Sequence, residues 1–218
     1  MGSKERLYAD IMAVHPEVTG SCNLVIVKQP DNTTVKFIVD CGLFQERKYS
    51  KNNESLPFIP ANIDFCLVTH NHVDHVGRLP FLVSKGFDKE IFISETTSKL
   101  LPLALEDSHK VLRDVAKRQN RPCLYTESDV AQTMKLIRPC KYNQTVQIRP
   151  NIKATFFQNG HLMGATSILV QIGYPGYENI NLFFTGDYNN KNMFFDVPPL
   201  PEWVLDLPVS YTHLTLPT

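Results

Sequence analysis

The sequence predicts an α+β fold in which two β-sheets pack face to face with helices outside them, an αββα sandwich. Strand-like segments come first, up to residue 68, and a mostly helical stretch follows between residues 79 and 137. Strand-like segments return between residues 145 and 184. Because each sheet and each amphipathic helix must bury an apolar face, this order favours stacked layers around a shared core.

The first strands are expected before residue 69. Residues 11–14 form a short apolar run that is typical of an edge strand. Residues 22–27 and 35–39 predict a hairpin, because the turn-rich residues 29–32 separate two apolar, β-rich runs. Residues 63–68 are apolar and bounded by polar residues, which indicates a buried strand.

The middle of the chain is expected to be mostly helical. Residues 45–60 are polar and contain two prolines, and they predict an exposed loop. Apolar residues at helical spacing predict helices over residues 79–85, 98–117 and 127–137, the last with Thr126 as its N-cap. The remaining expected strands cover residues 91–93, 145–148, 153–158, 167–172 and 180–184.

The charge pattern does not indicate a nucleic-acid partner. The chain has 22 Lys and Arg residues and 22 Asp and Glu residues, so there is no global basic field. Cations gather near the C-terminal end of the long predicted helix, where they could contact phosphates. The helix dipole is the better explanation, because it favours cations at that end and such residues mostly face solvent. These cations are Lys110, Arg113, Lys117, Arg118 and Arg121.

The cysteines predict a reducing compartment. They are odd in number and contain no C-x-x-C pair, which favours reduced thiols in a cytoplasmic protein over disulfides or zinc ligands. Neither a secretory segment nor a long apolar run is present, so neither export nor membrane spanning is expected. The sequence does not indicate an oligomeric state. The five cysteines are Cys22, Cys41, Cys66, Cys123 and Cys140.

Three imidazoles and a carboxylate lie within six positions directly after the strand over residues 63–68. If His70 and His72 stay extended, their side chains share one face and can reach one ion. Asp74 and His75 follow a turn and can point to a second position. Imidazole suits zinc, and a carboxylate adds a harder ligand. A polar loop with histidines by chance explains this density poorly, and we expect a metal site.

The H-x-H-x-D-H motif of residues 70–75, followed by Gly77, resembles the signature of the metallo-β-lactamase fold, whose members are mostly dinuclear zinc hydrolases. Residues 19–22, 40–45 and 77–80 are similar to the β-CASP branch of that superfamily. This branch includes ribonuclease J and the nuclease subunit of the pre-mRNA cleavage and polyadenylation machinery. The resemblance implies that RNA is the partner of the intact protein.

The resemblance also implies roles for residues elsewhere in the chain. His161, between Gly160 and Gly164, resembles the third histidine of the first metal position. Asp187 resembles the carboxylate that bridges both ions, and Asp40 resembles a residue that braces the metal loop without binding metal. The implied ligands are His70, His72 and His161 for one zinc, Asp74 and His75 for the second, and Asp187 between them.

These roles imply a metal-dependent hydrolase, most directly an RNA phosphodiesterase acting as an endo- or exoribonuclease. A dinuclear zinc site can hold a hydroxide between the ions and neutralise charge on a phosphoryl or acyl oxygen. Asp74 could also orient that hydroxide or accept its proton. Mn²⁺ or Fe²⁺ could replace Zn²⁺, because His and Asp ligands accept all three metals.

The end of the chain departs from the family pattern. The fold normally supplies one more histidine to the second metal, but His213 is the only histidine that follows Asp187 in the sequence. The domain that β-CASP enzymes insert is also absent. We therefore expect residues 1–208 to be the N-terminal portion of a metallo-β-lactamase domain, truncated before the β-CASP domain and weakly active or inactive.

Residues 209–218 are expected not to be native. They can be encoded by a string that matches a common transposase sequencing adapter read in reverse. A natural flexible terminus would have to match that string at every position by chance. We interpret the segment as read-through into the adapter and exclude it, with His213, from the fold.

The sequence is compatible with two other functions. A hydrolase of the same fold could act on thioesters or lactams, and fold analogy alone does not exclude it. Such small-molecule hydrolases lack a large inserted domain after Asp187. The other possibility is a non-catalytic subunit of an RNA-processing complex. The intact motif of residues 70–75 argues against it, since a subunit without chemistry would be expected to have lost some of these ligands.

Overall fold

The computed structural model describes residues 6–14, 19–207 and 210–211. Six strands form the first sheet, in the order in which they follow along the chain: β1 (Tyr8–Ala13), β2 (Asn23–Lys28), β3 (Thr34–Val39), β4 (Phe65–Val68), β5 (Ile91–Ser94) and β6 (Ile137–Cys140). The second sheet contains β7 (Thr145–Arg149), β8 (Ile152–Gln158), β9 (Thr166–Ile172), β10 (Ile180–Phe184) and β11 (Ser210–Tyr211), in the order β11-β10-β9-β8-β7.

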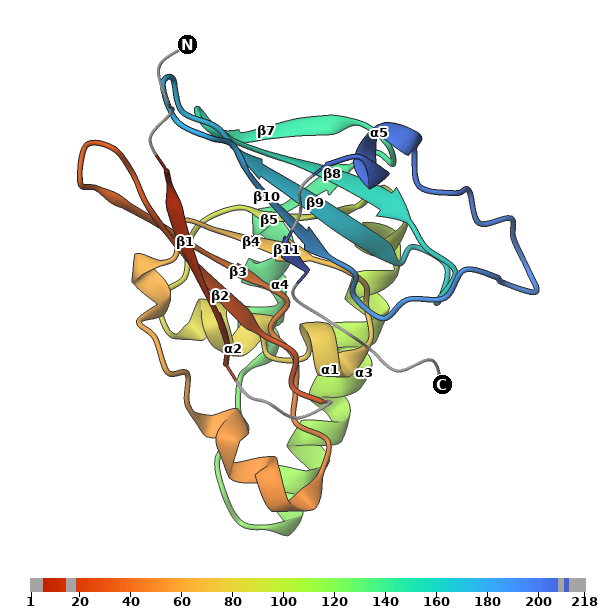
Figure 1. Ribbon diagram of the computed structural model, residues 1–218. Helices are drawn as coiled ribbons and strands as arrows, with labels where there is room; N and C mark the ends of the chain where they lie inside the picture. Colours follow the sequence, from red (N-terminus) through yellow and green to blue (C-terminus); the bar gives the residue numbers. More distant parts are fainter. Residues whose placement is uncertain (1–5, 15–18, 208–209, 212–218) are drawn as a thin grey trace.

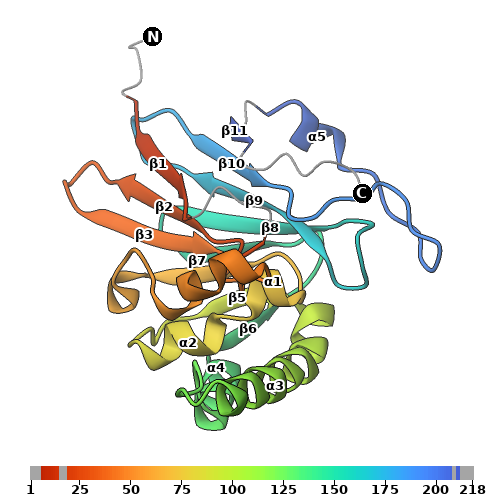
Figure 2. The ribbon, with the colours of Figure 1, turned by 90° about the horizontal axis from the view of Figure 1, so that it is seen from below.

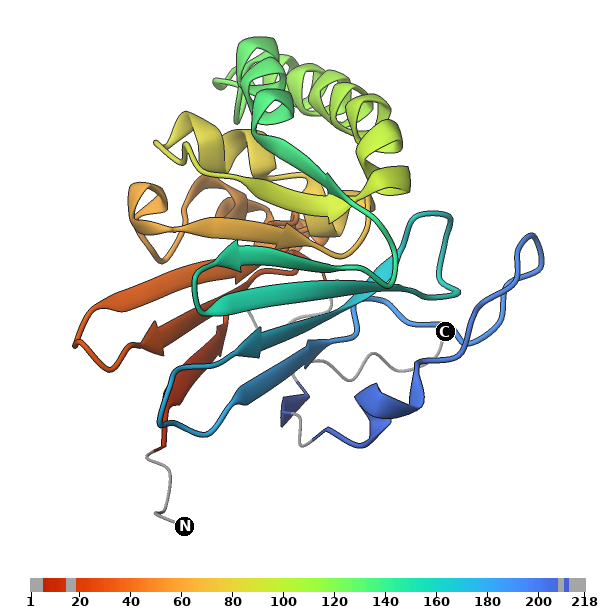
Figure 3. The ribbon, with the colours of Figure 1, turned by 90° about the horizontal axis from the view of Figure 1, so that it is seen from above.

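Helices cover the outer faces of the two sheets (Figure 1). They are α1 (Val73–Val76), α2 (Leu79–Ser84), α3 (Glu95–Arg118), α4 (Glu127–Leu136) and α5 (Glu202–Leu205). Helices α2, α3 and α4 lie beside the first sheet, and α5 lies on the opposite side of the molecule, beyond the second sheet (Figures 2 and 3). The predicted αββα sandwich is confirmed.

Successive side chains along a strand point to opposite faces of the sheet and so belong to different core layers. In β4, Phe65 and Leu67 contact the second sheet, whereas Cys66 and Val68 contact the helices. Phe65 stacks on Phe37 of β3, with ring centroids 4.6 Å apart. All four β4 side chains are buried, which explains why this strand reads as a continuous apolar run. A smaller apolar cluster joins α5 to the outer face of the second sheet.

Strand direction brings two functional segments together. The pairs β3–β4, β4–β5 and β5–β6 are parallel, so these strands end at the same edge of the first sheet. Asp40 directly follows β3, and its backbone N–H donates to the carbonyl oxygen of Leu67 in β4. The residues after β4 therefore start beside Asp40.

Three segments differ from the expectation. The polar residues 45–60 contain the 3₁₀ helices η1 (Arg47–Glu54) and η2 (Pro60–Asn62), where a loop was predicted. Buried Arg78 orders this segment by donating hydrogen bonds to the carbonyl oxygens of Asn52 and Ser55, which no local pattern reveals. Strand β6 was not predicted because it contains Pro139, which an edge strand tolerates. Helix α5 lies in the segment after residue 184, for which no helix was predicted.

The other predicted elements are confirmed within one to three residues at each end. The five cysteines are free, and four of them are buried. Of the helices in the described ranges, not one combines the length and the apolar composition that a bilayer-spanning helix requires. The interpretation of residues 209–218 as adapter concerns a segment that, apart from Ser210–Tyr211, lies outside the described residues, and it stays a prediction.

The N-terminus of α4 provides a test of local stability. Thr126 accepts a hydrogen bond from the backbone of Asp129, whose side chain bonds back to the Thr126 backbone, completing a capping box. Substitution Thr126→Ala should lower the free energy of unfolding by about 1 kcal/mol, because an N–H group of the first turn loses its partner. Urea unfolding of the full chain measures this. Thr126→Ser keeps the acceptor and should stay close to wild type, and an equal loss in both variants would contradict the capping explanation.

Candidate metal centre

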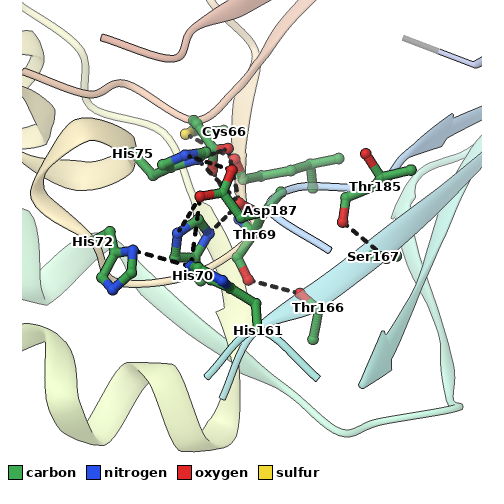
Figure 4. A network of polar contacts seen from close by, with 12 residues as sticks. Cys66, Thr69, His70, His72, His75, His161, Thr166, Ser167, Thr185 and Asp187 are labelled. Carbon is green, nitrogen blue, oxygen red and sulfur yellow. Dashed lines mark hydrogen bonds and ion pairs between the residues drawn. The ribbon is translucent and has the colours of Figure 1, made fainter. Parts of the chain in front are cut away.

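Four potential metal ligands meet at one end of the sandwich. His70 and His72 follow β4, His161 lies in the loop between β8 and β9, and Asp187 follows β10. Their ligand atoms all lie within 4.8 Å of one another. Figure 4 shows the three imidazoles and the Asp187 carboxylate pointing toward one another. The structure thus brings together residues that are far apart in the sequence and that follow strands of both sheets.

The spacing of these atoms fits a tetrahedral ion. A tetrahedral zinc with bonds of about 2.0–2.1 Å has ligand atoms about 3.4 Å apart. His161 Nε2 lies 3.1 Å from His72 Nδ1 and 3.5 Å from Asp187 Oδ2. His70 Nε2 lies 3.9 Å from the same carboxylate oxygen. His70 Nε2 is buried and has no hydrogen-bond partner within the described part of the chain, as expected of an atom that binds metal.

A second position adjoins the first. His75 on α1 places its Nε2 atom 3.3 Å from Asp187 Oδ1, the oxygen that does not face His70 and His161. Asp74 lies half-buried in the first turn of α1, next to His75 but outside the four-residue group. Asp187 thus turns one oxygen toward His75 and the other toward His70 and His161. The assignment of individual residues to individual ions stays a prediction.

Asp40 holds this region in place. Its Oδ1 atom accepts a hydrogen bond from the backbone N–H of Thr69 at 2.8 Å, and its Oδ2 atom accepts from Thr69 Oγ1 at 2.8 Å. Oδ2 also lies 2.8 Å from His75 Nδ1. Asp40 adopts a left-handed backbone conformation with φ of 64°, which is uncommon for a residue other than glycine. These contacts suit the predicted orienting role, in which Asp40 does not bind metal.

Burial and neighbouring charges shift the pKa values of two imidazoles in opposite directions, downward for His70 and upward for His75. Burial, together with the neighbouring His75, holds the pKa of His70 well below its usual range. Burial alone would also lower the pKa of His75, but the Asp40 and Asp187 carboxylates raise it to about 10. For Asp187, burial opposes ionisation, but the hydrogen bond and the charge of His75 outweigh it and lower the pKa. Without metal, His75 is therefore protonated between two carboxylates at pH 7.

Close backbone contacts fix the loops that carry the ligands. A Cβ at Gly42 would overlap the carbonyl oxygen of Asp74, so only glycine lets the chain after β3 pass α1. Gly164, with φ of 97°, places its carbonyl oxygen 2.7 Å from the hydroxyls of both Ser94 and Thr97 at the start of α3. This contact anchors the loop of His161 to the first sheet and its helix.

Sequence reasoning did not assign a role to two threonines at the site. Thr69 directly precedes the motif of residues 70–75, and it contacts Asp40 and lies 3.0 Å from His70 Nδ1. Thr166 at the start of β9 donates from both its backbone and its hydroxyl to the carbonyl oxygen of Thr69. The sequence signal that could have indicated this role for Thr69 is a hydroxyl residue directly before His70. His109 on α3 lies outside the four-residue group of potential metal ligands and stacks on Tyr125 with ring centroids 5.9 Å apart.

The fold and the site together are those of a metallo-β-lactamase superfamily domain. The family described as the metallo-beta-lactamase superfamily domain matches residues 28–192, about three quarters of the chain, and the chain belongs to that superfamily. The solved structure of Rm3 metallo-beta-lactamase matches with a TM-score of 0.51 and 18% identity, over 89% of this chain and 65% of that one. This likeness concerns the fold alone.

Among curated proteins, similar relatives include two that are named as ribonucleases and one that is named as a transcription termination factor. Ribonuclease TTHA0252 of Thermus thermophilus is 31% identical over 87% of this chain, and endoribonuclease ysh1 of Aspergillus fumigatus is 30% identical over 80%. Transcription termination factor FttA of Methanocaldococcus jannaschii is 31% identical over 78%. The predicted resemblance to RNA-processing nucleases is confirmed. The chain spans 40%, 19% and 25% of the lengths of these three relatives, respectively.

The protonated state of His75 makes metal binding depend on pH. Since its pKa of about 10 lies above neutral pH, a metal that binds Nε2 at pH 7 must displace one proton. Zinc binding should therefore release about one proton and should strengthen as the pH rises from 7 toward 10. Isothermal titration calorimetry in buffers with different ionisation enthalpies measures the proton count.

Two variants separate this explanation from a general pH effect. His75→Gln should bind zinc more weakly and lose the released proton, whereas His109→Gln, on the far part of α3, should behave as wild type. A proton count near zero for the wild-type chain would show that His75 is neutral before the metal binds.

Proposed function

We propose that this chain forms the metal-binding part of a zinc-dependent RNA phosphodiesterase of the β-CASP group. The observation that carries the proposal is the placement of the Asp187 carboxylate. Its Oδ2 atom faces His70 and His161, while its Oδ1 atom faces His75. A carboxylate with one oxygen toward each of two imidazole groups is suited to join two ions in a dinuclear site.

In the proposed site each residue has one role. His70, His72 and His161 would bind the first ion, and Asp74 and His75 the second, with Asp187 shared between them. Asp40 would stay outside the coordination sphere and keep Nδ1 of His75 protonated, so that Nε2 faces the metal. We propose zinc because neutral imidazoles dominate the set, although Mn²⁺ and Fe²⁺ accept the same ligands.

The chemistry divides between the ions and the protein. When bound, the two ions would supply a water of lowered pKa and neutralise charge that develops on a phosphoryl oxygen. The half-buried carboxylate of Asp74 would orient the attacking water and accept its proton. Asp187 would hold the two groups of imidazoles at a fixed separation. No nucleophilic side chain is required, and the proton for the leaving oxygen has to come from elsewhere.

RNA is proposed as the substrate on the strength of the relatives. Proteins named ribonuclease and endoribonuclease match most of this chain, as do a cleavage and polyadenylation specificity factor subunit of Arabidopsis thaliana and an Integrator complex subunit of Danio rerio. RNA is therefore the proposed partner, with the cleavage mode left as endo- or exonucleolytic. Cytoplasmic location is proposed as well, and the free cysteines support a reducing compartment.

The direct test is metal-dependent RNA cleavage. The purified full chain, loaded with zinc, should cleave a fluorescently labelled single-stranded RNA slowly but above the metal-free background, and a chelator should abolish the cleavage because the ions supply the reactive water. His72→Ala and Asp187→Asn should reduce the rate to the metal-free background. Gel analysis of the labelled fragments measures rate and cleavage mode together.

Matched substrates and a control variant separate the alternatives. His109→Ala, outside the site, should cleave at the wild-type rate. Hydrolysis of a thioester or a β-lactam without RNA cleavage would support a small-molecule hydrolase instead. Stoichiometric zinc binding without hydrolysis of any of these substrates would favour a non-catalytic subunit.

A further inference from the structure

Thr69 lies at the meeting point of the segments that build the metal centre. Besides its two hydrogen bonds to Asp40, its carbonyl oxygen accepts from the backbone N–H of Thr166 at 2.9 Å and from Thr166 Oγ1 at 3.0 Å. A Cβ built on Gly186, directly before Asp187, would lie 2.8 Å from Cβ of Thr69. Figure 4 shows Thr69 between the imidazoles of His70 and His75 and the strand that begins at Thr166.

The donors and acceptors around the Thr69 hydroxyl determine its hydrogen bonds. His75 Nδ1 lies 3.4 Å from Thr69 Oγ1 but only 2.8 Å from Asp40 Oδ2, so its hydrogen goes to Asp40. The hydroxyl of Thr69 has one hydrogen, and Thr69 Oγ1 donates it to Asp40 Oδ2 at 2.8 Å. Thr69 Oγ1 also lies 3.0 Å from His70 Nδ1. Because its hydrogen is already used, the hydroxyl can only accept there, so His70 Nδ1 must carry a proton. The order of donation is therefore His70 Nδ1 to Thr69 Oγ1 to Asp40 Oδ2.

This order determines which nitrogen of His70 is available. A neutral imidazole protonated at Nδ1 has its lone pair on Nε2. His70 Nε2 is one of three buried side-chain atoms without a hydrogen-bond partner in the described ranges, and it faces the Asp187 carboxylate at 3.9 Å. The side chain of His70 is fully buried, so water does not compete for Nδ1.

We propose that Thr69 is a positioning residue that fixes the Nδ1-protonated tautomer of His70 and thereby leaves Nε2 free to bind metal. Asp40 then controls both metal positions with one carboxylate oxygen. It holds His75 directly through Nδ1 at 2.8 Å, and it holds His70 through the Thr69 hydroxyl. The inference rests on the proposed function only in so far as His70 is a ligand, and its first test requires no metal.

The tautomer can be measured in the metal-free chain. Long-range ¹H–¹⁵N correlation spectra of the full chain, labelled at histidine nitrogens, should show His70 with a protonated Nδ1 and an unprotonated Nε2. If His70 of the wild-type chain carries its proton on Nε2, the proposal is overturned without any variant. This measurement therefore decides the matter even where a substituted chain does not fold.

Two substitutions at the same position test the positioning role. Thr69→Val keeps the shape but removes the hydroxyl, and it should lose the single tautomer of His70 and weaken zinc binding about 10- to 100-fold. Thr69→Ser restores the hydroxyl and should recover both the spectrum and the affinity. Thr133→Val removes another buried hydroxyl, which donates to Asp129 in α4, and should leave both unchanged.

The outcomes separate this inference from the proposed function. If Thr69→Val keeps the wild-type tautomer of His70 and the wild-type zinc affinity, the positioning role is overturned, whatever the RNA assay shows. If the tautomer shift and the affinity loss are observed and wild-type chain does not cleave RNA, the positioning role stands and the phosphodiesterase proposal fails.

Discussion

The hydrogen bonds accepted by the Asp40 carboxylate are the constraint on which the metal centre depends. They join the end of β3 to the residue after β4 and to His75 on α1. Parallel pairing of β3 with β4 brings these partners within reach, and the left-handed backbone of Asp40 turns its carboxylate toward them. The backbone conformation is unfavourable by itself, so the three hydrogen bonds and the surrounding packing must offset it.

The site combines groups that disfavour one another when no metal is present. A buried imidazole with an unpaired nitrogen, His70, lies against an imidazolium, His75, with ring centroids 4.0 Å apart. Two carboxylates compensate the charge of His75, but His70 Nε2 stays without a partner among the described residues. An orphaned buried polar atom costs about 1–3 kcal/mol, which the apolar cores on both faces of the first sheet must supply.

Much of this arrangement could be predicted from the sequence because its signals are local. Four of the predicted ligands lie together in one motif over residues 70–75, and the buried strands and amphipathic helices have clear periodicity. Other features depend on contacts between distant segments. Residues 45–60 are ordered by hydrogen bonds from buried Arg78. Strand β6 can contain Pro139 because it lies at the edge of its sheet. Thr69 has its role because Asp40, which follows the neighbouring strand, accepts its hydrogen bonds. His161 and Asp187 were found through resemblance, since single residues at strand ends have no periodicity of their own.

The potential metal ligands come from segments of both sheets, and this affects how the two sheets are held together. His70 and His72 extend from the first sheet, whereas His161 and Asp187 extend from loops of the second. A bound ion would therefore act as a cross-link between the two sheets at one end of the sandwich. Removing it would leave that end held by the threonine contacts and the anchor at Gly164, so the loops after β8 and β10 should become the first places where a protease can cut.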